Sequence, residues 1–111
     1  MIECIFCCIG RKEINTKLVF ENELIVAFDD IKPKAPVHFL VIPKKHIENL
    51  FDIGESDRSI LAEIQIIIPK LALKKGLDKG FRVIQNNGAG GRQEVYHLHY
   101  HVLGGGEFKF F

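Results

Sequence analysis

Residues 95–103 read V-Y-H-L-H-Y-H-V-L and predict a long final strand. Three of the chain's five histidines lie in this run, at every second position. Because a strand repeats its side-chain direction every second residue, His97, His99 and His101 are expected on one face, about 6–7 Å apart, with apolar residues on the other. Imidazole suits proton transfer, nucleophilic attack and metal ligation near neutral pH. The histidine row is therefore the expected functional site.

Outside this run, the sequence predicts an antiparallel α+β domain. Period-two patterns and flanking turn residues predict further strands at 17–21, 24–28, 37–42 and 81–85. The order is three strands, a helix and two strands, with links short enough for hairpins. This order favours one antiparallel sheet covered by a helix.

Helices are expected at three places. Residues 4–9 predict a first turn or short helix, and 44–50 a short helix after Pro43. A long helix should begin near Ser56 or Asp57, either of which can cap it, and Gly76 is a plausible end. Pro69 lies inside its apolar pattern and is expected to kink or divide it.

Composition narrows the class of protein. The 111 residues suit a single domain, 1–111, and 47% hydrophobic with 26% charged residues is ordinary for a soluble globular protein. A net charge of +1 gives no basic footprint of a nucleic-acid binder. The start M-I-E-C-I-F-C-C lacks the basic and long apolar regions of a signal peptide, and no apolar run reaches membrane-spanning length. We expect a cytoplasmic protein without nucleic-acid or membrane partners.

Three readings of the histidine row follow from the residues alone. In the first, the three histidines have only a structural role. This interpretation is unfavourable, because a dry core on that face would bury three polar rings at a high cost in free energy. As a catalytic metal site, His-x-His can chelate zinc from a strand. As a nucleophilic site, the middle histidine attacks while its neighbours orient it or contact substrate. The loop Gly88-Ala89-Gly90-Gly91 before the row suits close approach of backbone amides to a phosphate, although such loops also serve as hairpin turns.

At this point the chain resembles a known family. V-Y-H-L-H-Y-H-V-L-G-G (95–105) is similar to the signature of the histidine-triad (HIT) nucleotide hydrolases and transferases. The segment A-F-D-D-I-K-P-K-A-P-V-H-F-L-V-I-P-K-K-H-I (27–47) resembles the nucleoside-binding half of the Hint branch, the purine nucleoside phosphoramidases. C-I-F-C (4–7) and R-V-I-Q-N-N-G (82–88) also fit. The resemblance implies a five-stranded antiparallel sheet with one long and one short helix, and a homodimer whose sheets form one continuous ten-stranded sheet.

The resemblance also implies roles for the histidines. His99 would attack the α-phosphorus of a nucleotide and form a nucleotidyl-histidine intermediate, which water then releases as the nucleoside monophosphate. Neutral imidazole is a good nucleophile at pH 7, so this role is chemically sound. His101 would contact the phosphate oxygens, and His38 on the neighbouring strand would complete a relay. His97 is the remaining member of the catalytic set.

The same resemblance implies a purine nucleotide site, with AMP or GMP as substrate part or product and no organic cofactor. Asp30 would bind the ribose and Asn86 the phosphate or leaving-group side. The other nucleotide-binding residues implied are the apolar base walls Phe6, Ile9, Phe28 and Ile31, and the loop residues Gly91, Gln93 and Glu94. Glu94 replaces a serine of better-known animal members, and an ionised carboxylate cannot donate a hydrogen bond. It either faces outward or shifts leaving-group preference.

Cys4-x-x-Cys7 has the spacing of a zinc half-site. By similarity to bacterial members, His46 and His97 would complete a structural zinc site and leave His99 for chemistry. Two reduced, partly buried cysteines remain the alternative. An odd number of clustered cysteines argues against a disulfide framework.

The leading hypothesis is hydrolysis of the P–N bond in purine nucleoside 5′-phosphoramidates. Within the family, the alternative is hydrolysis of dinucleoside polyphosphates or adenylylated by-products. A different class is a nucleotide-binding regulatory module with incidental catalysis, and another is a zinc hydrolase that uses the histidine row as ligands.

Overall fold

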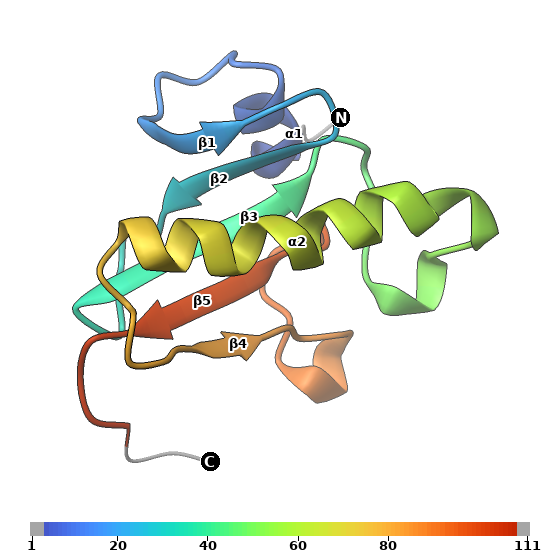
Figure 1. Cartoon of the computed structure of the whole chain (residues 1–111). Helices are drawn as coiled ribbons and strands as arrows, with labels where there is room; N and C mark the ends of the chain where they lie inside the picture. The colour runs from blue at the N-terminus through green and yellow to red at the C-terminus, as the bar shows by residue number, and fades with distance from the viewer. Residues whose placement is uncertain (1–3, 109–111) are drawn as a thin grey trace.

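The computed structural model describes residues 4–108, which fold around one five-stranded antiparallel sheet (Figure 1). The strands lie in the order β1-β2-β3-β5-β4. Their bounds are Leu18–Glu21 (β1), Ile25–Asp29 (β2), Val37–Pro43 (β3), Arg82–Ile84 (β4) and Tyr100–Gly104 (β5). Helix α1 spans Ile5–Gly10 and α2 spans Arg58–Lys74, with short 3-10 turns at Leu50–Asp52, Glu55–Asp57 and Ala89–Gly91. The predicted α+β class, strand order along the chain and long helix are confirmed.

The two faces of the sheet carry different partners. Helix α2 crosses one face, whereas α1 lies behind the sheet in Figure 1. Because side chains alternate along a strand, neighbouring residues of β2 and β3 enter different apolar clusters. The cluster under α2 contains Ile25, Ala27, Phe39, Val41 and Val102, together with Ile60, Ile64, Ile67, Ile68 and Leu71 of the helix. The cluster under α1 contains Phe6, Ile9, Val26, Phe28, Leu40 and Ile42. His38 and His101 fall on the α1 face by the same alternation.

Helix α2 ends as the sequence predicts but is not divided. Gly76 has a φ of +84°, a left-handed conformation that glycine adopts without steric cost. Its N–H donates to the carbonyl of Leu73, and the Leu77 N–H donates to that of Ala72, which makes a Schellman motif. The sequence predicts a kink or a division at Pro69, and because the helix continues through this residue, the division is wrong. Residues on both sides of Pro69, such as Ile68 and Leu71, are buried against the sheet, and this packing favours a continuous helix.

Two expected elements do not form. The final strand begins only at Tyr100, and residues 44–50 form no helix, with just a 3-10 turn starting at Leu50. The two irregular segments bond to each other instead: the Leu98 N–H donates to the Ile47 carbonyl at 2.6 Å, and the Gln93 amide donates to the Glu48 carbonyl at 2.6 Å. These cross-links take the backbone groups that a longer strand and a short helix would have used.

In the part of the chain that the structure describes, no helix has the length and apolar character needed to cross a membrane.

Candidate active site and metal centre

His38 and His101 form a hydrogen-bonded pair across β3 and β5. The Lys34 N–H donates to His38 Nδ1 at 3.1 Å, so the proton of the neutral ring lies on Nε2. His38 Nε2 is 2.9 Å from His101 Nδ1 and therefore donates to it. The His101 proton must then lie on its own Nε2. One backbone amide in the loop before β3 thus determines which nitrogen of His101 is a donor.

Burial keeps both rings neutral at pH 7. Desolvation lowers the pKa of His38, against an opposing effect of the Asp30 carboxylate. Desolvation, followed by the neighbouring His99 and His38, lowers the pKa of His101 to about 4. Each ring consequently has one N–H donor and one acceptor nitrogen at neutral pH.

Asp30 joins this pair at its edge. Its Oδ2 lies 3.4 Å from His38 Nε2, and its Oδ1 accepts from the Lys32 N–H at 2.8 Å. Asp30, His38 and His101 are close enough together to surround a metal ion. However, the only lone pair of neutral His38 already accepts the Lys34 N–H, so His38 has none left for a metal. The arrangement fits a hydrogen-bond relay rather than a metal site.

His99 is oriented by the backbone of His97. Its Nδ1–H donates to the His97 carbonyl at 2.7 Å, which leaves the Nε2 lone pair without that bond. The ring is 5% exposed and lies 5.0 Å from the His101 ring and 5.2 Å from the Phe6 ring, between centroids. A nucleophilic nitrogen and the N–H donor of His101 are therefore neighbours.

The expected row of three histidines on one strand face is wrong. Only His101 lies within β5, and the segment that carries His97 and His99 is irregular. His99 and His101 still come together. The His97 ring is 0% exposed and points to the cysteines instead. The His97 carbonyl therefore accepts a hydrogen bond from His99, while the His97 ring belongs to a second site.

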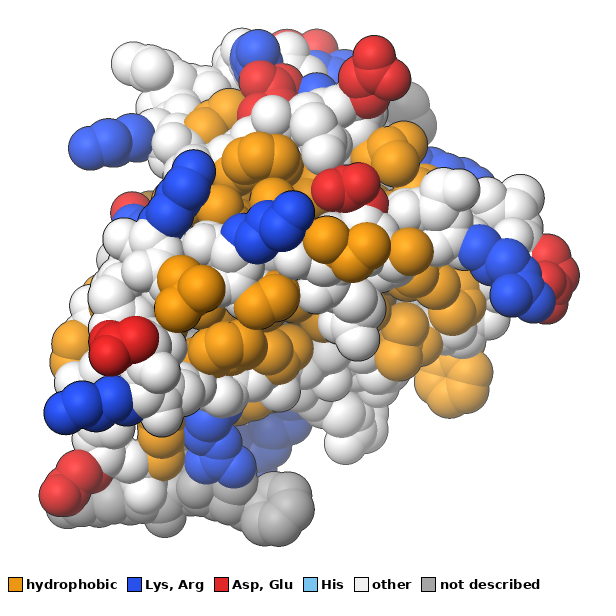
Figure 2. Space-filling view, viewed as in Figure 1, with side chains coloured by type: hydrophobic (Ala, Val, Ile, Leu, Met, Phe, Trp, Pro, Cys, Tyr) orange, Lys and Arg blue, Asp and Glu red, His pale blue; other side chains and the backbone are white. Residues whose placement is uncertain are grey.

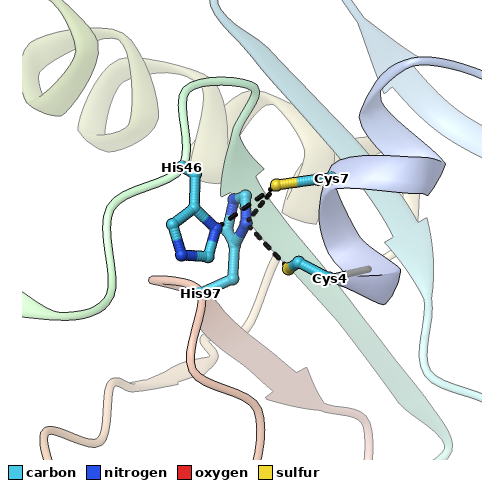
Figure 3. Close-up of side chains that lie close together, drawn as sticks. All are labelled: Cys4, Cys7, His46 and His97. Atoms are coloured by element: carbon cyan, nitrogen blue, oxygen red, sulfur yellow. Dashed lines mark hydrogen bonds between the residues drawn. The ribbon is translucent and has the colours of Figure 1, made fainter. Parts of the chain in front are cut away.

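That second site is a cluster of two cysteines and two histidines (Figure 3). Cys4 and Cys7 project from the start of α1 toward His46, in the segment after β3, and toward His97. The Sγ atoms of Cys4 and Cys7 lie 3.5 Å from His97 Nδ1, and Cys7 Sγ lies 3.3 Å from His46 Nδ1. All four ligand atoms lie within 4.8 Å of one another, close enough to hold a metal ion.

The donor chemistry of this cluster fits zinc. In a tetrahedral site, sulfur and nitrogen ligands would be about 3.6 Å apart, given the usual Zn–S and Zn–N bond lengths. His97 Nε2 donates to the Pro43 carbonyl at 2.7 Å, so its Nδ1 lone pair faces both sulfurs. Burial lowers the pKa of His97 to about 4, against the opposing effect of that bond, which favours the neutral, ligating form. Two thiols cannot both donate to one lone pair, whereas one cation can accept all the ligands.

The apolar residues expected around a base separate into two groups. Phe6, Ile9 and Phe28 lie in the cluster under α1, with the Phe6 and Phe28 rings 5.5 Å apart between centroids. Ile31 is 91% exposed in the loop after β2, outside that cluster. Leu40 of β3 completes the apolar surface, and its place on the same face as Phe28 could have been found from strand alternation.

The residues expected in and around the glycine-rich loop differ in their hydrogen bonds and burial. Buried Gln93 accepts from Gly88 N–H and Asn49 Nδ2 and donates to two carbonyls, so its amide holds the glycine-rich loop in place. Asn87, rather than Asn86, accepts from the Leu50 N–H. The remaining residues expected here are Asn86, half-buried, Gly91 in the 3-10 turn, and Glu94, exposed.

No sequence pattern identifies the backbone groups that orient the histidines. The Lys34 N–H and the carbonyls of Pro43 and His97 have no side-chain signature, since every non-proline residue carries the same groups. Only their positions in the folded chain make them part of the site.

Residues 11–108 match the HIT domain. The chain is 42% identical over 104 residues to Protein HitA of Neisseria gonorrhoeae, an alignment that covers 94% of this chain and 97% of that protein. The structure is similar to a HIT family hydrolase from Legionella pneumophila Philadelphia 1, with a TM-score of 0.91, 48% identity and 95% of each chain covered. It is also similar to a histidine triad nucleotide-binding protein from Candida albicans, with a TM-score of 0.81, 36% identity, and 90% of this chain and 73% of that one covered.

Proposed function

The chain belongs to the HIT domain family, and we propose that it is a hydrolase that cleaves the P–N bond of purine nucleoside 5′-phosphoramidates. The relatives named a hydrolase and a nucleotide-binding protein support the general class. The substrate type rests on the resemblance of residues 27–47 to the phosphoramidase branch.

The observation that carries the proposal is the tautomer of His99. Because its Nδ1–H is held by the His97 carbonyl at 2.7 Å, its Nε2 lone pair can attack phosphorus. The adjacent His101 carries its proton on Nε2, set by the bond from His38. A nucleophile beside a donor for a phosphate oxygen is the arrangement that nucleotidyl transfer needs.

In the proposed first step, His99 Nε2 forms a bond to the α-phosphorus and the P–N bond breaks. The amine leaves with the electron pair of that bond and takes up a proton from solvent. His99 then carries the nucleotidyl group with its Nδ1–H still donated to His97, which disperses the positive charge of the ring. His101 Nε2–H donates to a phosphate oxygen and stabilises the developing charge.

In the second step, water attacks the same phosphorus and releases a proton to solvent, and the His99–phosphorus bond breaks with its electron pair returning to His99 Nε2. The products are the nucleoside monophosphate, AMP or GMP, and neutral His99. Asp30 would accept hydrogen bonds from the ribose hydroxyls, and the Phe6–Phe28 pair would contact the base. Asn86, Gly91 and Glu94 would face the phosphate and its leaving group.

The test is release of the amine from a fluorogenic adenosine 5′-phosphoramidate by the native chain and by His99→Ala. We expect turnover to fall by about 10³-fold or more in the variant, because the nucleophile is lost. Equal activity in both proteins would move the chemistry away from His99. No turnover by the native chain, with hydrolysis of a dinucleoside polyphosphate or nucleotide binding alone, would select one of the alternative functions.

We propose further that zinc occupies the cluster of Cys4, Cys7, His46 and His97, as a structural ion. Its bound form would fix these four side chains together and take no part in the steps at phosphorus. Within residues 4–108, the cysteines form no disulfide bond, and a reducing cytoplasmic location would maintain their thiols.

A homodimer is the last part of the proposal. Strand β4 is at one edge of the sheet, so two copies joined along β4 would form a continuous ten-stranded sheet. Exposed apolar side chains on β4 and α2 support this arrangement.

A further inference from the structure

Helix α1 joins the cluster of cysteines and histidines to the proposed nucleophile. Cys4 and Cys7 belong to that cluster, and Phe6 lies between them in the sequence. The centroid of the Phe6 ring is 5.9 Å from that of His97 and 5.2 Å from that of His99. A chemical change at the two sulfurs can therefore reach His99 through this helix.

Cys4 and Cys7 are placed to form a disulfide bond with each other. Cys4 is the N-cap of α1, and its carbonyl accepts from the Cys8 N–H at 3.1 Å, so Cys4 and Cys7 are three positions apart on one helical turn. This spacing puts their Cα atoms about 5 Å apart, within the roughly 4.4–6.8 Å that disulfides span. The two sulfurs lie within 4.8 Å of each other, so they need to approach by less than about 3 Å to form a bond.

The cluster is accessible from one side. The His97 ring is 0% exposed, whereas His46 is exposed, and Cys7, with its Sγ 3.3 Å from His46 Nδ1, is only half-buried. A small oxidant can therefore reach the Cys7 sulfur from the side of His46. Bound zinc would hold both cysteines as thiolates, which is the form that reacts with peroxides.

We propose that Cys4 and Cys7 are a redox-sensitive pair, which hydrogen peroxide converts to a disulfide with release of the bound ion. This inference rests on the proposed zinc site. The Cys7 thiolate attacks one oxygen of the peroxide, which forms a sulfenic acid and releases hydroxide. The Cys4 thiolate then attacks the Cys7 sulfur, and a second hydroxide leaves. Two electrons pass from the sulfurs to the peroxide, and both hydroxides take up protons from solvent to become water.

Oxidation of this pair loosens helix α1. The disulfide leaves only the two imidazoles of His46 and His97 as ligands, which is too few for a structural zinc site. Helix α1, with six residues, is too short to be stable alone and is then held mainly by the apolar packing of Phe6 and Ile9. Phe6 therefore loses part of what fixes it beside His99. A dithiol that reduces the bond, together with added zinc, restores the original arrangement.

The test treats the zinc-loaded full chain, native and Cys8→Ser, with hydrogen peroxide. Cys8 lies outside the cluster, so the variant keeps Cys4 and Cys7 as its only thiols and excludes disulfides with Cys8. A colorimetric chelator measures zinc release, and intact mass measures the state of the sulfurs. In both proteins we expect about one zinc released per disulfide formed, with a mass lower by two hydrogens than that of the reduced, zinc-free chain. Dithiothreitol and added zinc should reverse both changes.

Hydrogen exchange measures the effect on α1 without any substrate. The backbone N–H groups of residues 8 and 11 donate to the carbonyls of Cys4 and Cys7. Their exchange in Cys8→Ser should become at least about tenfold faster after oxidation and slow again after reduction with zinc. The Val41 amide, in the central strand β3, is the internal control and should keep its rate.

The outcomes separate this inference from the proposals on which it builds. Zinc that stays bound while peroxide oxidises other residues would overturn the redox pair and leave the zinc site standing, as would release with sulfinic acid in place of a disulfide. A disulfide without faster exchange in α1 would overturn the link to His99. A native chain that binds no zinc would overturn both the pair and the metal site. None of these measurements uses turnover, so a failure of the hydrolase proposal appears only in the comparison with His99→Ala.

Discussion

Backbone groups decide what each histidine of the site does. The Lys34 N–H places the proton of His38 on Nε2, and the His97 carbonyl holds the Nδ1–H of His99. The Pro43 carbonyl does the same for His97, whose lone pair then faces the sulfurs. Similar rings thereby differ in which nitrogen keeps its lone pair, as the proposed roles of relay, nucleophile and metal ligand require. These differences between the rings arise from backbone groups and require no further side chains.

Acid should weaken the fold through His101. Burial lowers its pKa to about 4, whereas in the unfolded chain it returns to about 6.5. Between these values the unfolded chain binds a proton that the folded chain does not. The free energy of unfolding should therefore fall as the pH decreases from about 6.5 to 4, by up to about 1.4 kcal/mol per pH unit. Burial also lowers the pKa of His38, which acts in the same direction.

Urea unfolding between pH 4 and pH 8 measures this effect. His101→Gln keeps a hydrogen-bonding side chain of similar size but does not titrate, so its stability should change less steeply over the same range. An equal slope in the variant and the native chain would show that His101 does not contribute.

At the scale of elements, the cluster of Cys4, Cys7, His46 and His97 brings together segments with little stability of their own. Helix α1 has six residues, far fewer than the roughly 12–15 that an isolated helix needs. The segment of His46 and the segment of His97 are both irregular. Side chains from all three meet at the same point (Figure 3). Since α1 also places Phe6 beside His99, the cluster supports the active site through the position of this helix.

Cys7→Ser should therefore lose the metal and much of the stability. We expect about one zinc per native chain by elemental analysis, little in the variant, and a melting temperature lower by at least about 10 °C, because binding of a structural zinc contributes directly to folding. Cys8→Ser is the matched control, since Cys8 lies outside the cluster. Zinc well below one per chain in native protein purified without chelators would contradict the site.

For the whole molecule, exposed apolar side chains indicate a surface that a second copy could cover. Hydrophobic side chains gather over α2 in Figure 2. Ile66 and Leu73 of α2 are 54% and 64% exposed, and Val83 of the edge strand β4 is 42% exposed. An apolar helix face beside an unpaired strand edge is costly to leave in water in a domain of this size.

Sedimentation equilibrium at micromolar concentration should give twice the chain mass of 12.6 kDa. Val83→Lys adds a charge to the strand edge and should shift the population toward the single chain. Ile31→Lys changes an apolar residue that is also exposed, 91%, but lies in the loop after β2, and it should leave the mass unchanged. A native chain that sediments only as the 12.6 kDa species would exclude the dimer.

Local patterns in the sequence were sufficient for most of the fold. The period-two runs predicted the strands, the spacing of isoleucine and leucine predicted α2, and Gly76 predicted its end. The alternating histidines and the Cys4-x-x-Cys7 spacing also predicted side chains that the structure brings together, although their chemical roles stay a prediction. Each of these signals depends on neighbours within a few residues, so the sequence alone contains them.

Tertiary structure decided the path of the irregular segments and the orientation of the histidine rings, because both depend on partners that are distant in the chain. Alternation at 95–99 would make a strand only beside another strand, but the Leu98 N–H bonds to Ile47 instead. In this irregular segment, the ring of His97 points to Cys4 and Cys7 rather than along the histidine row, and its Nε2 donates to the Pro43 carbonyl. The proton positions on the rings likewise follow from backbone groups brought close by folding. The residue types came from the sequence, and the separation of His97 from His99 and His101 came from the packing of the irregular segments.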